Sequence, residues 1–252
     1  DFLTAILTRT PENLFWADFC ALREVLAYYG AHSALAQLLL KVTVPGTPDF
    51  YQGTEVWNFN LTDPDNRRPV DFTKLKALLS NLRAQEKTRD RLSLLAELLR
   101  SWRDGRLKLY VTYKALSCRR DHAGVFTAGS YLPLKATGQR VQHVCAFIRQ
   151  RYETQILVAV PQLLVRLQQR FAPGPEGPAA PAVAPPMPPL GKATWGDDAL
   201  LLPANTACAW RNLFTGETIK AFSPPHLPSC CRRTVPTSRE GLSPFPGRPA
   251  AS

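Results

Sequence analysis

The sequence predicts an α/β segment followed by an all-β segment of antiparallel strands, which we expect to form a β-sandwich. Apolar residues at three- and four-residue spacing in the first part of the chain indicate amphipathic helices. A short β-branched run then leads into an aromatic loop, which is typical of an α/β unit. From about residue 107 the pattern changes to short apolar runs separated by Gly, Asp and charged turns, which indicates strands.

The first predicted helix begins at Thr10, a capping residue followed by a proline in the first helical position. It runs to about Tyr29, and we expect Gly30 to end it. A short second helix is expected over Ser33–Leu39. It leads into a buried strand over Leu40–Val44, which a Pro-Gly pair stops.

Helix is predicted again from Phe72 to about Trp102, because leucines recur there in two stripes at helical spacing, and an Asp-Gly pair ends it. Residues 1–106 therefore form the first predicted unit. Residues 107–222 form the predicted antiparallel β domain. Its expected strands lie in "LKLYVTY", "GVFTAGSYLPL", "HVCAFIRQ", "TQILVAVPQLL", "WGDDALLLP" and "TACAWRNLFTGETIKAF".

Two stretches, one inside the predicted β domain and one after it, lack the pattern of strands. Residues 171–191 are rich in Pro and Gly, so they cannot form a sheet ladder, and we expect a disordered insertion. Residues 223–252 show no periodicity and contain scattered prolines, so we expect an unstructured tail.

Composition and charge narrow the function classes. The net charge of +11 invites a nucleic-acid interpretation, and residues 83–120 hold eleven Lys or Arg against four Asp or Glu. Those cations alternate with leucines at helical spacing, as on a solvated helix face, and no recognition motif accompanies them. We expect no nucleic-acid partner and no membrane span, because no apolar run reaches about 18 residues. The chain opens inside an apolar-periodic segment, so we expect it to be a piece of a longer protein.

The six cysteines are scattered, with no CxxC pair and no histidine at ligand spacing. A zinc site or a secreted disulfide framework is therefore not expected, and neither metal nor cofactor is implied. Cytoplasm is the default compartment for such a chain.

The motif "PGTPDFYQGTE" resembles the segment after the eighth barrel strand of the α-amylase clan, through Gly46, Pro48, Tyr51, Gly53 and Glu55. The motifs "DPDNRRPVDF", "KLYVTYKAL", "VFTAGSYLPL", "HVCAFIRQ" and "WRNLFTG", in this order, narrow the resemblance to the maltooligosyltrehalose synthases. The resemblance implies that residues 1–106 are the last βα portion of a TIM-type (β/α)8 barrel with trailing helices.

The resemblance also implies an activity. Such a synthase converts the reducing-end α-1,4 bond of a maltooligosaccharide, an α-1,4-glucan, into an α,α-1,1 bond, in trehalose biosynthesis. Retention of configuration requires two carboxyl groups close together, one as nucleophile and one as acid and base. In the clan these groups, with a third carboxylate, sit at the ends of barrel strands four, five and seven. This chain resembles only the part after strand seven, so we expect no catalytic residue here and a missing N-terminal barrel portion as partner.

The candidate substrate-binding residues lie in one loop. Tyr51, Gln52 and Trp57 could form a wall of the sugar pocket, or they could pack the last strand onto the barrel. Arg67 and Arg68 could donate to sugar hydroxyls or hold a catalytic carboxylate. Alternatively they pair with the nearby aspartates, Asp63 or Asp65, and we expect one of the two arginines to point inward.

Further alternatives stay open at this point. For Glu55 a salt bridge or loop cap is favoured over ligand contact. The chain as a whole could instead be a fragment of another α-amylase-clan hydrolase or transglycosylase. A rival from a different class is a non-catalytic glucan-binding module made of the β domain.

Overall fold

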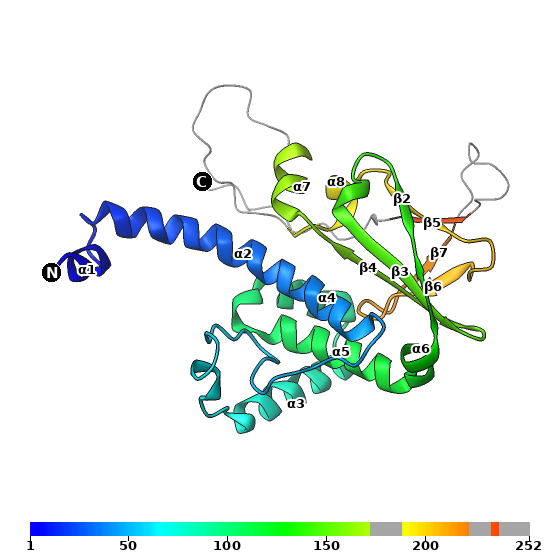
Figure 1. Cartoon of the computed structure of the whole chain (residues 1–252), viewed down its shortest axis with the longest axis horizontal. Helices are drawn as coiled ribbons and strands as arrows, with labels where there is room; N and C mark the ends of the chain where they lie inside the picture. The colour runs from blue at the N-terminus through cyan, green and yellow to red at the C-terminus, as the bar shows by residue number, and fades with distance from the viewer. Residues whose placement is uncertain (172–187, 222–232, 237–252) are drawn as a thin grey trace.

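The computed structural model describes residues 1–171, 188–221 and 233–236. Helices occupy the first half of the chain and strands begin only at Ser130 (Figure 1). The helices are α1 (Phe2–Leu7), α2 (Leu14–Thr43), α3 (Phe72–Thr88), α4 (Arg91–Arg100), α5 (Arg106–Asp121), α6 (Ala123–Ala128), α7 (Leu164–Phe171) and α8 (Gly191–Trp195), with 3₁₀ turns η1 (Asp65–Arg67), η2 (Trp102–Asp104) and η3 (Val141–His143).

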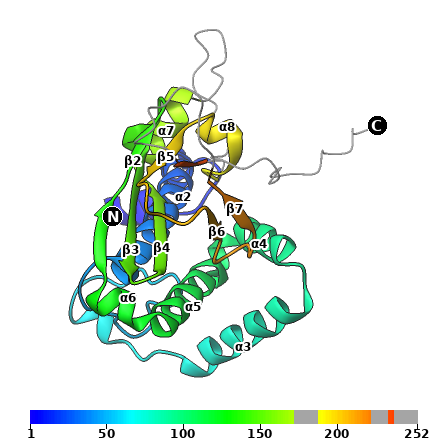
Figure 2. The same cartoon turned by 90° about the vertical axis from the view of Figure 1, so that its right-hand side faces the viewer.

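The strands form three small antiparallel sheets. One has the order β1-β3-β4, the second β2-β5-β8, and the third pairs β6 with β7. The β3–β4 hairpin is the longest pairing, and in Figure 2 the strands lie above helices α3, α4 and α5. The strands are β1 (Ser130–Pro133), β2 (Lys135–Thr137), β3 (Val144–Arg151), β4 (Thr154–Pro161), β5 (Ala199–Leu202), β6 (Ala209–Arg211), β7 (Thr218–Lys220) and β8 (Arg233–Pro236).

The predicted helix–helix–strand series before residue 45 is wrong, because α2 is one continuous helix. It is capped by Asn13, whose Oδ1 accepts from the Trp16 backbone N–H at 3.1 Å, and not by Thr10. Gly30 lies inside the helix, where a glycine costs only about 1 kcal/mol. Val42 and Thr43 stay helical although they are β-branched, since both are buried by tertiary packing. The expected barrel strand over Leu40–Val44 is therefore absent.

Strands were also expected from Leu107 onward, and this expectation is wrong for the first of them. Residues 106–121 form helix α5. Leu107, Tyr110, Val111 and Ala115 are all buried, which is helical spacing. Leu109 and Thr112 are buried as well, so the helix is covered on several sides and no single apolar stripe marks its sequence as helical.

The antiparallel strands over "HVCAFIRQ" and "TQILVAVPQLL" are confirmed as β3 and β4, although α7 takes the end of the second run. The antiparallel strands of the predicted class are thus confirmed, whereas residues 1–106, predicted as an α/β unit, contain helices and no strand. Of the expected insertion 171–191, residues 172–187 lie outside the described part, and its end is ordered, since Trp195 Nε1 donates to Pro189 O at 2.9 Å. Of the expected tail 223–252, Arg233–Pro236 is not unstructured but pairs with β5, and the remainder lies outside the described residues.

Helix α2 connects the two parts of the fold. Leu38 and Val42 belong to a core shared with α3, α4 and α5, while Ala36 packs on Phe147 and Val158 of the β3–β4 hairpin. Both faces of the C-terminal half of α2 are therefore covered. Its N-terminal half carries α1 away from the body of the molecule (Figure 1).

Arg149 on β3 is the largest fully buried side chain, with 1% of its surface exposed. Its guanidinium donates to the carbonyl of Thr43 at 2.9 Å, to those of Val125 and Phe126 at 3.1 Å, and to those of Gly129 and Ser130 at 3.1 and 3.2 Å. These acceptors lie at the ends of α2 and α6 and at the start of β1. One side chain thus joins two helices and two strands.

We expect Arg149→Met to destabilise the fold by about 3 kcal/mol or more, because it leaves buried carbonyls without donors. The measurement is equilibrium unfolding in urea followed by circular dichroism. Arg120→Met serves as the matched control, since Arg120 is exposed and pairs only with its neighbour Asp121. Equal unfolding midpoints for the two variants would contradict this assignment.

His32 of α2 is 8% exposed and stacks on Tyr28 with ring centroids 4.3 Å apart. Its Nδ1 lies 3.0 Å from Tyr28 O and donates to it as a neutral tautomer, while Nε2 has no hydrogen-bond partner among the described residues. Burial lowers the pKa of His32 below its usual value, and the Tyr28 carbonyl opposes this in part.

A lowered pKa in the folded state means that the unfolded chain binds the proton more tightly. The contribution of His32 to stability is therefore complete above the unfolded pKa of about 6.5, and it is lost as pH falls below that value toward the folded pKa. We expect the urea midpoint to fall between pH 7.5 and 5.5, and the fall to be smaller in His32→Phe. An unchanged slope in His32→Phe would refute the role of His32.

Candidate functional site

The 45–71 loop carries every candidate substrate-binding residue, and its start is fixed by Arg119 of α5. Arg119 donates from Nη1 to Val42 O at 2.5 Å and from Nη2 to Gly46 O at 2.8 Å. These contacts bind the last carbonyls of α2, where a cation is also favoured by the helix dipole. The loop therefore leaves α2 in one defined direction.

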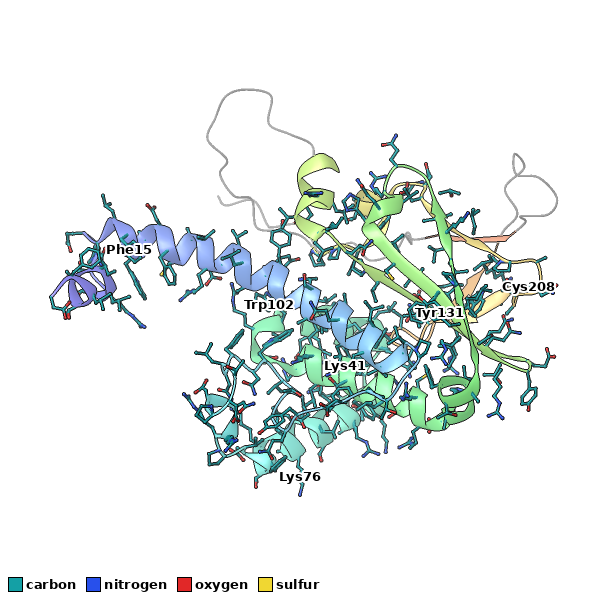
Figure 3. The ribbon with its side chains drawn as sticks, viewed as in Figure 1. Phe15, Lys41, Lys76, Trp102, Tyr131 and Cys208 are labelled. Atoms are coloured by element: carbon teal, nitrogen blue, oxygen red, sulfur yellow. The ribbon has the colours of Figure 1, made fainter. Side chains whose placement is uncertain are left out.

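Trp57 anchors the middle of the loop. Its Nε1 donates to Trp102 O at 2.5 Å, and the two rings meet edge-to-face with centroids 6.3 Å apart. Trp102 also meets Tyr28 of α2 edge-to-face at 6.0 Å, beside α2 as Figure 3 shows. A Cβ on Gly105, whose φ is +82°, would lie 2.9 Å from Val56 Cβ, so glycine allows this close approach. Of the two interpretations of Trp57, these contacts match the packing role.

Lys108 of α5 holds the same stretch from the other side. Its Nζ donates to Val56 O at 3.0 Å and lies 5.6 Å from the Trp57 ring centroid. Burial and the nearby Lys41 lower the pKa of Lys108, and the charge of Glu55 partly offsets them. Glu55 Oε2 is buried without a hydrogen-bond partner in the described part of the chain, so the salt bridge expected for Glu55 is not formed there.

Arg67 and Arg68 pair with the loop's own aspartates. Arg67 donates to Asp63 through Nε at 2.7 Å and Nη2 at 2.6 Å, and Arg68 binds Asp65. Both guanidinium groups are well exposed, so neither points inward as expected for one of them. Asp65 Oδ2 also accepts from the Leu61 backbone N–H at 2.7 Å, and the pairs shape the η1 turn.

Tyr51 and Gln52 lie exposed in the first part of the loop, before Gly53. Tyr51 is 45% exposed, and only its carbonyl is engaged, by Thr54 N at 3.3 Å and Thr54 Oγ1 at 2.6 Å. Their side chains are exposed, as are those of Arg67 and Arg68, but unlike the two arginines they form no ion pair within the described residues.

A pocket of about 350 Å³ lies between the loop, the start of α3 and η2. Of the five predicted site residues only Trp57 lines it. Polar groups at its edge are already engaged: Asp71 Oδ1 caps α3 by accepting from Lys74 N at 2.9 Å, and Arg103 binds Glu24. The pocket therefore does not bring the predicted residues together.

Sequence reasoning missed Trp102 and Lys108, which fix the loop from positions distant in the sequence. No local signal could identify them, because they lie in segments read as helix end and strand. Within the described residues no group of three or more His, Cys, Asp or Glu side chains could hold a metal ion. In the same residues no helix has both the length and the apolar character that crossing a bilayer demands.

The anchoring role of Trp57 predicts that Trp57→Phe lowers the free energy of unfolding by about 1 kcal/mol, the usual worth of one buried hydrogen bond. Tyr51→Phe should leave it unchanged, since the Tyr51 side chain is exposed and makes no hydrogen bond within the described residues. Thermal unfolding by calorimetry measures both variants. Equal stability of Trp57→Phe and wild type would contradict the anchoring role of Trp57 and favour the pocket-wall interpretation instead.

No protein-family model matches the chain. Two curated proteins, from the CDC 1551 / Oshkosh and H37Rv strains of Mycobacterium tuberculosis and provisionally named maltooligosyl trehalose synthase, are each 39% identical to it over 151 residues. Each match covers 59% of this chain and 16% of the relative.

Solved structures show the same similarity. The maltooligosyltrehalose synthase of Arthrobacter ramosus matches with a TM-score of 0.60 and 27% identity, over 86% of this chain and 23% of that one. A further solved maltooligosyl trehalose synthase matches with a TM-score of 0.54 and 28% identity, over 90% of this chain and 25% of that one. The chain is therefore similar to maltooligosyltrehalose synthases over only part of their length.

Proposed function

We propose that this chain is part of a maltooligosyltrehalose synthase, a (1→4)-α-D-glucan 1-α-D-glucosylmutase. The whole enzyme would convert the reducing-end α-1,4 bond of a maltooligosaccharide into an α,α-1,1 bond. The observation that carries the proposal is the 39% identity over 151 residues, supported by the TM-score of 0.60 to a solved synthase. The order of the sequence motifs points in the same direction.

The chemistry itself belongs to the portion of the enzyme that this chain does not contain. A retaining reaction needs a nucleophile and an acid–base carboxyl group about 5–5.5 Å apart. Asp63 and Asp65 are each engaged by an arginine at an exposed turn, which suits turn formation rather than nucleophilic attack. In the proposal the carboxylates lie on an N-terminal TIM-type barrel portion, against which the helices of this chain close. The sheets of this chain form a trailing β-sandwich domain.

The role proposed for this chain is a wall of the sugar pocket. The 45–71 loop exposes Tyr51 and Gln52, and the aromatic face of Tyr51 can stack on a pyranose ring. Arg67 uses two of its five N–H donors on Asp63, so the others remain available for sugar hydroxyls. Keeping water from the reacting ends is the second use of such a wall, because the released glucose must be recaptured and not hydrolysed.

The isolated chain should neither isomerise nor hydrolyse maltopentaose, because loss of a catalytic group typically costs several orders of magnitude in rate. Co-expression with the N-terminal portion of the Mycobacterium tuberculosis relative, ending where its matched residues begin, should restore formation of the trehalosyl product. Chromatography of the products measures both.

In the restored enzyme Tyr51→Ala should reduce kcat/KM about tenfold, whereas Tyr152→Ala, in the β3–β4 turn, should have no effect. Product from the purified isolated chain would contradict the proposed location of the carboxylates. A restored enzyme that released glucose alone would favour a hydrolase of the same clan instead.

A further inference from the structure

The exposed part of α2 has an unusual composition. Its first fourteen residues, 14–27, comprise eleven apolar side chains and only three charged ones, Asp18, Arg23 and Glu24. A helix that is apolar on all sides is normally buried. Here it projects from the body of the molecule together with α1 (Figures 1 and 3).

Large apolar side chains on this part of the helix face solvent. Phe15, Phe19, Leu22 and Leu26, called the Phe15 face below, are 48%, 44%, 57% and 61% exposed. They follow one another at spacings of four, three and four residues, so they share one side of α2. Leu14 and three residues of α1 add further exposed apolar surface: Phe2, Leu3 and Leu7.

The second half of the same helix shows what such a surface normally does. Beyond residue 27, Leu38 and Val42 are at most 5% exposed in the helical core, and Ala36 packs on the β3–β4 hairpin. One continuous helix is thus buried over one half and bare over the other. Covering four large apolar side chains removes their surface from water, so a bare face of this size favours a partner.

We propose that the Phe15 face packs against the N-terminal portion of a maltooligosyltrehalose synthase, as two parts of one folded chain pack together. This inference rests on the proposed function and names the surface through which the two portions meet. Its partner is a large folded polypeptide whose contacting side chains are apolar, and which covers α2 on more than one side.

Two observations favour this occupant. The solved synthase that matches this chain over 86% of its residues uses only 23% of its own length to do so, which leaves a large polypeptide to cover the helix. The charges near the face are balanced: Glu12, Asp18 and Glu24 stand against Arg9, Arg23 and Arg103. Helices that lie on membranes are instead rich in Lys and Arg. A second copy would cover one stripe only and leave Leu14 on another side exposed.

The first experiment measures binding and needs no turnover. The full chain is mixed with the N-terminal portion of the Mycobacterium tuberculosis relative, ending where its matched residues begin. We expect a 1:1 complex by light scattering after gel filtration. The variant Phe19→Asp/Leu22→Asp should raise Kd about tenfold or more, as truncation of central interface residues does. Tyr152→Asp, an exposed apolar-to-acidic change on the β3–β4 turn, is the matched control and should bind like wild type.

A second measurement joins the two portions in one chain, because separately made pieces do not always associate. Phe19→Asp/Leu22→Asp should leave the melting temperature of the isolated chain unchanged and lower that of the joined chain. Equal effects in both contexts, or unchanged affinity in the first experiment, would overturn the proposal. So would self-association or vesicle binding of the isolated chain that the double variant abolishes while the joined chain is unaffected. A complex that forms through this face but makes no trehalosyl product would refute the proposed function and leave the interface standing.

Discussion

The buried guanidinium of Arg149 is the contact on which the rest of the structure depends. Five backbone carbonyls surround it, and they come from the ends of α2 and α6 and the start of β1. A buried charge without a carboxylate is costly, and burial together with Arg119 lowers the pKa of Arg149. The cost is offset because helix C-termini present oriented carbonyl dipoles to the cation. Removal of the charge would leave those carbonyls unpaired. Arg149 therefore holds the ends of α2 and α6 and the start of β1 in their relative positions.

The position of the 45–71 loop follows from this contact. Thr43 is the last residue of α2, and its carbonyl is held by Arg149 while Arg119 holds Val42 and Gly46. The loop then passes along α5 and is fixed again at Trp57 and Lys108. The backbone of the loop is therefore held at its start and again near its middle.

Helix α2 also explains how one segment serves two purposes. Its C-terminal half belongs to the cores of the helical part and of the β3–β4 hairpin. Its N-terminal half has the composition of a buried helix without the packing of one. One continuous helix therefore joins the exposed N-terminal half to the residue from which the 45–71 loop begins.

The sequence by itself determined the order of helices before strands, the β3–β4 hairpin and the family resemblance, because alternating apolar runs and motif order are local properties. It misassigned residues 40–44 and 107–113 as strands, since β-branched or continuously apolar runs fit a buried helix as well as a buried strand. Tertiary structure decided between them by covering α2 and α5 on several sides. It likewise decided the contacts of the candidate residues. Arg67 and Arg68 form ion pairs with Asp63 and Asp65, and Trp57 donates a hydrogen bond to Trp102. The arginine–aspartate pairs span three or four residues and could be weighed from sequence. The Trp57 contact spans forty-five residues, and only the folded chain brings those atoms together.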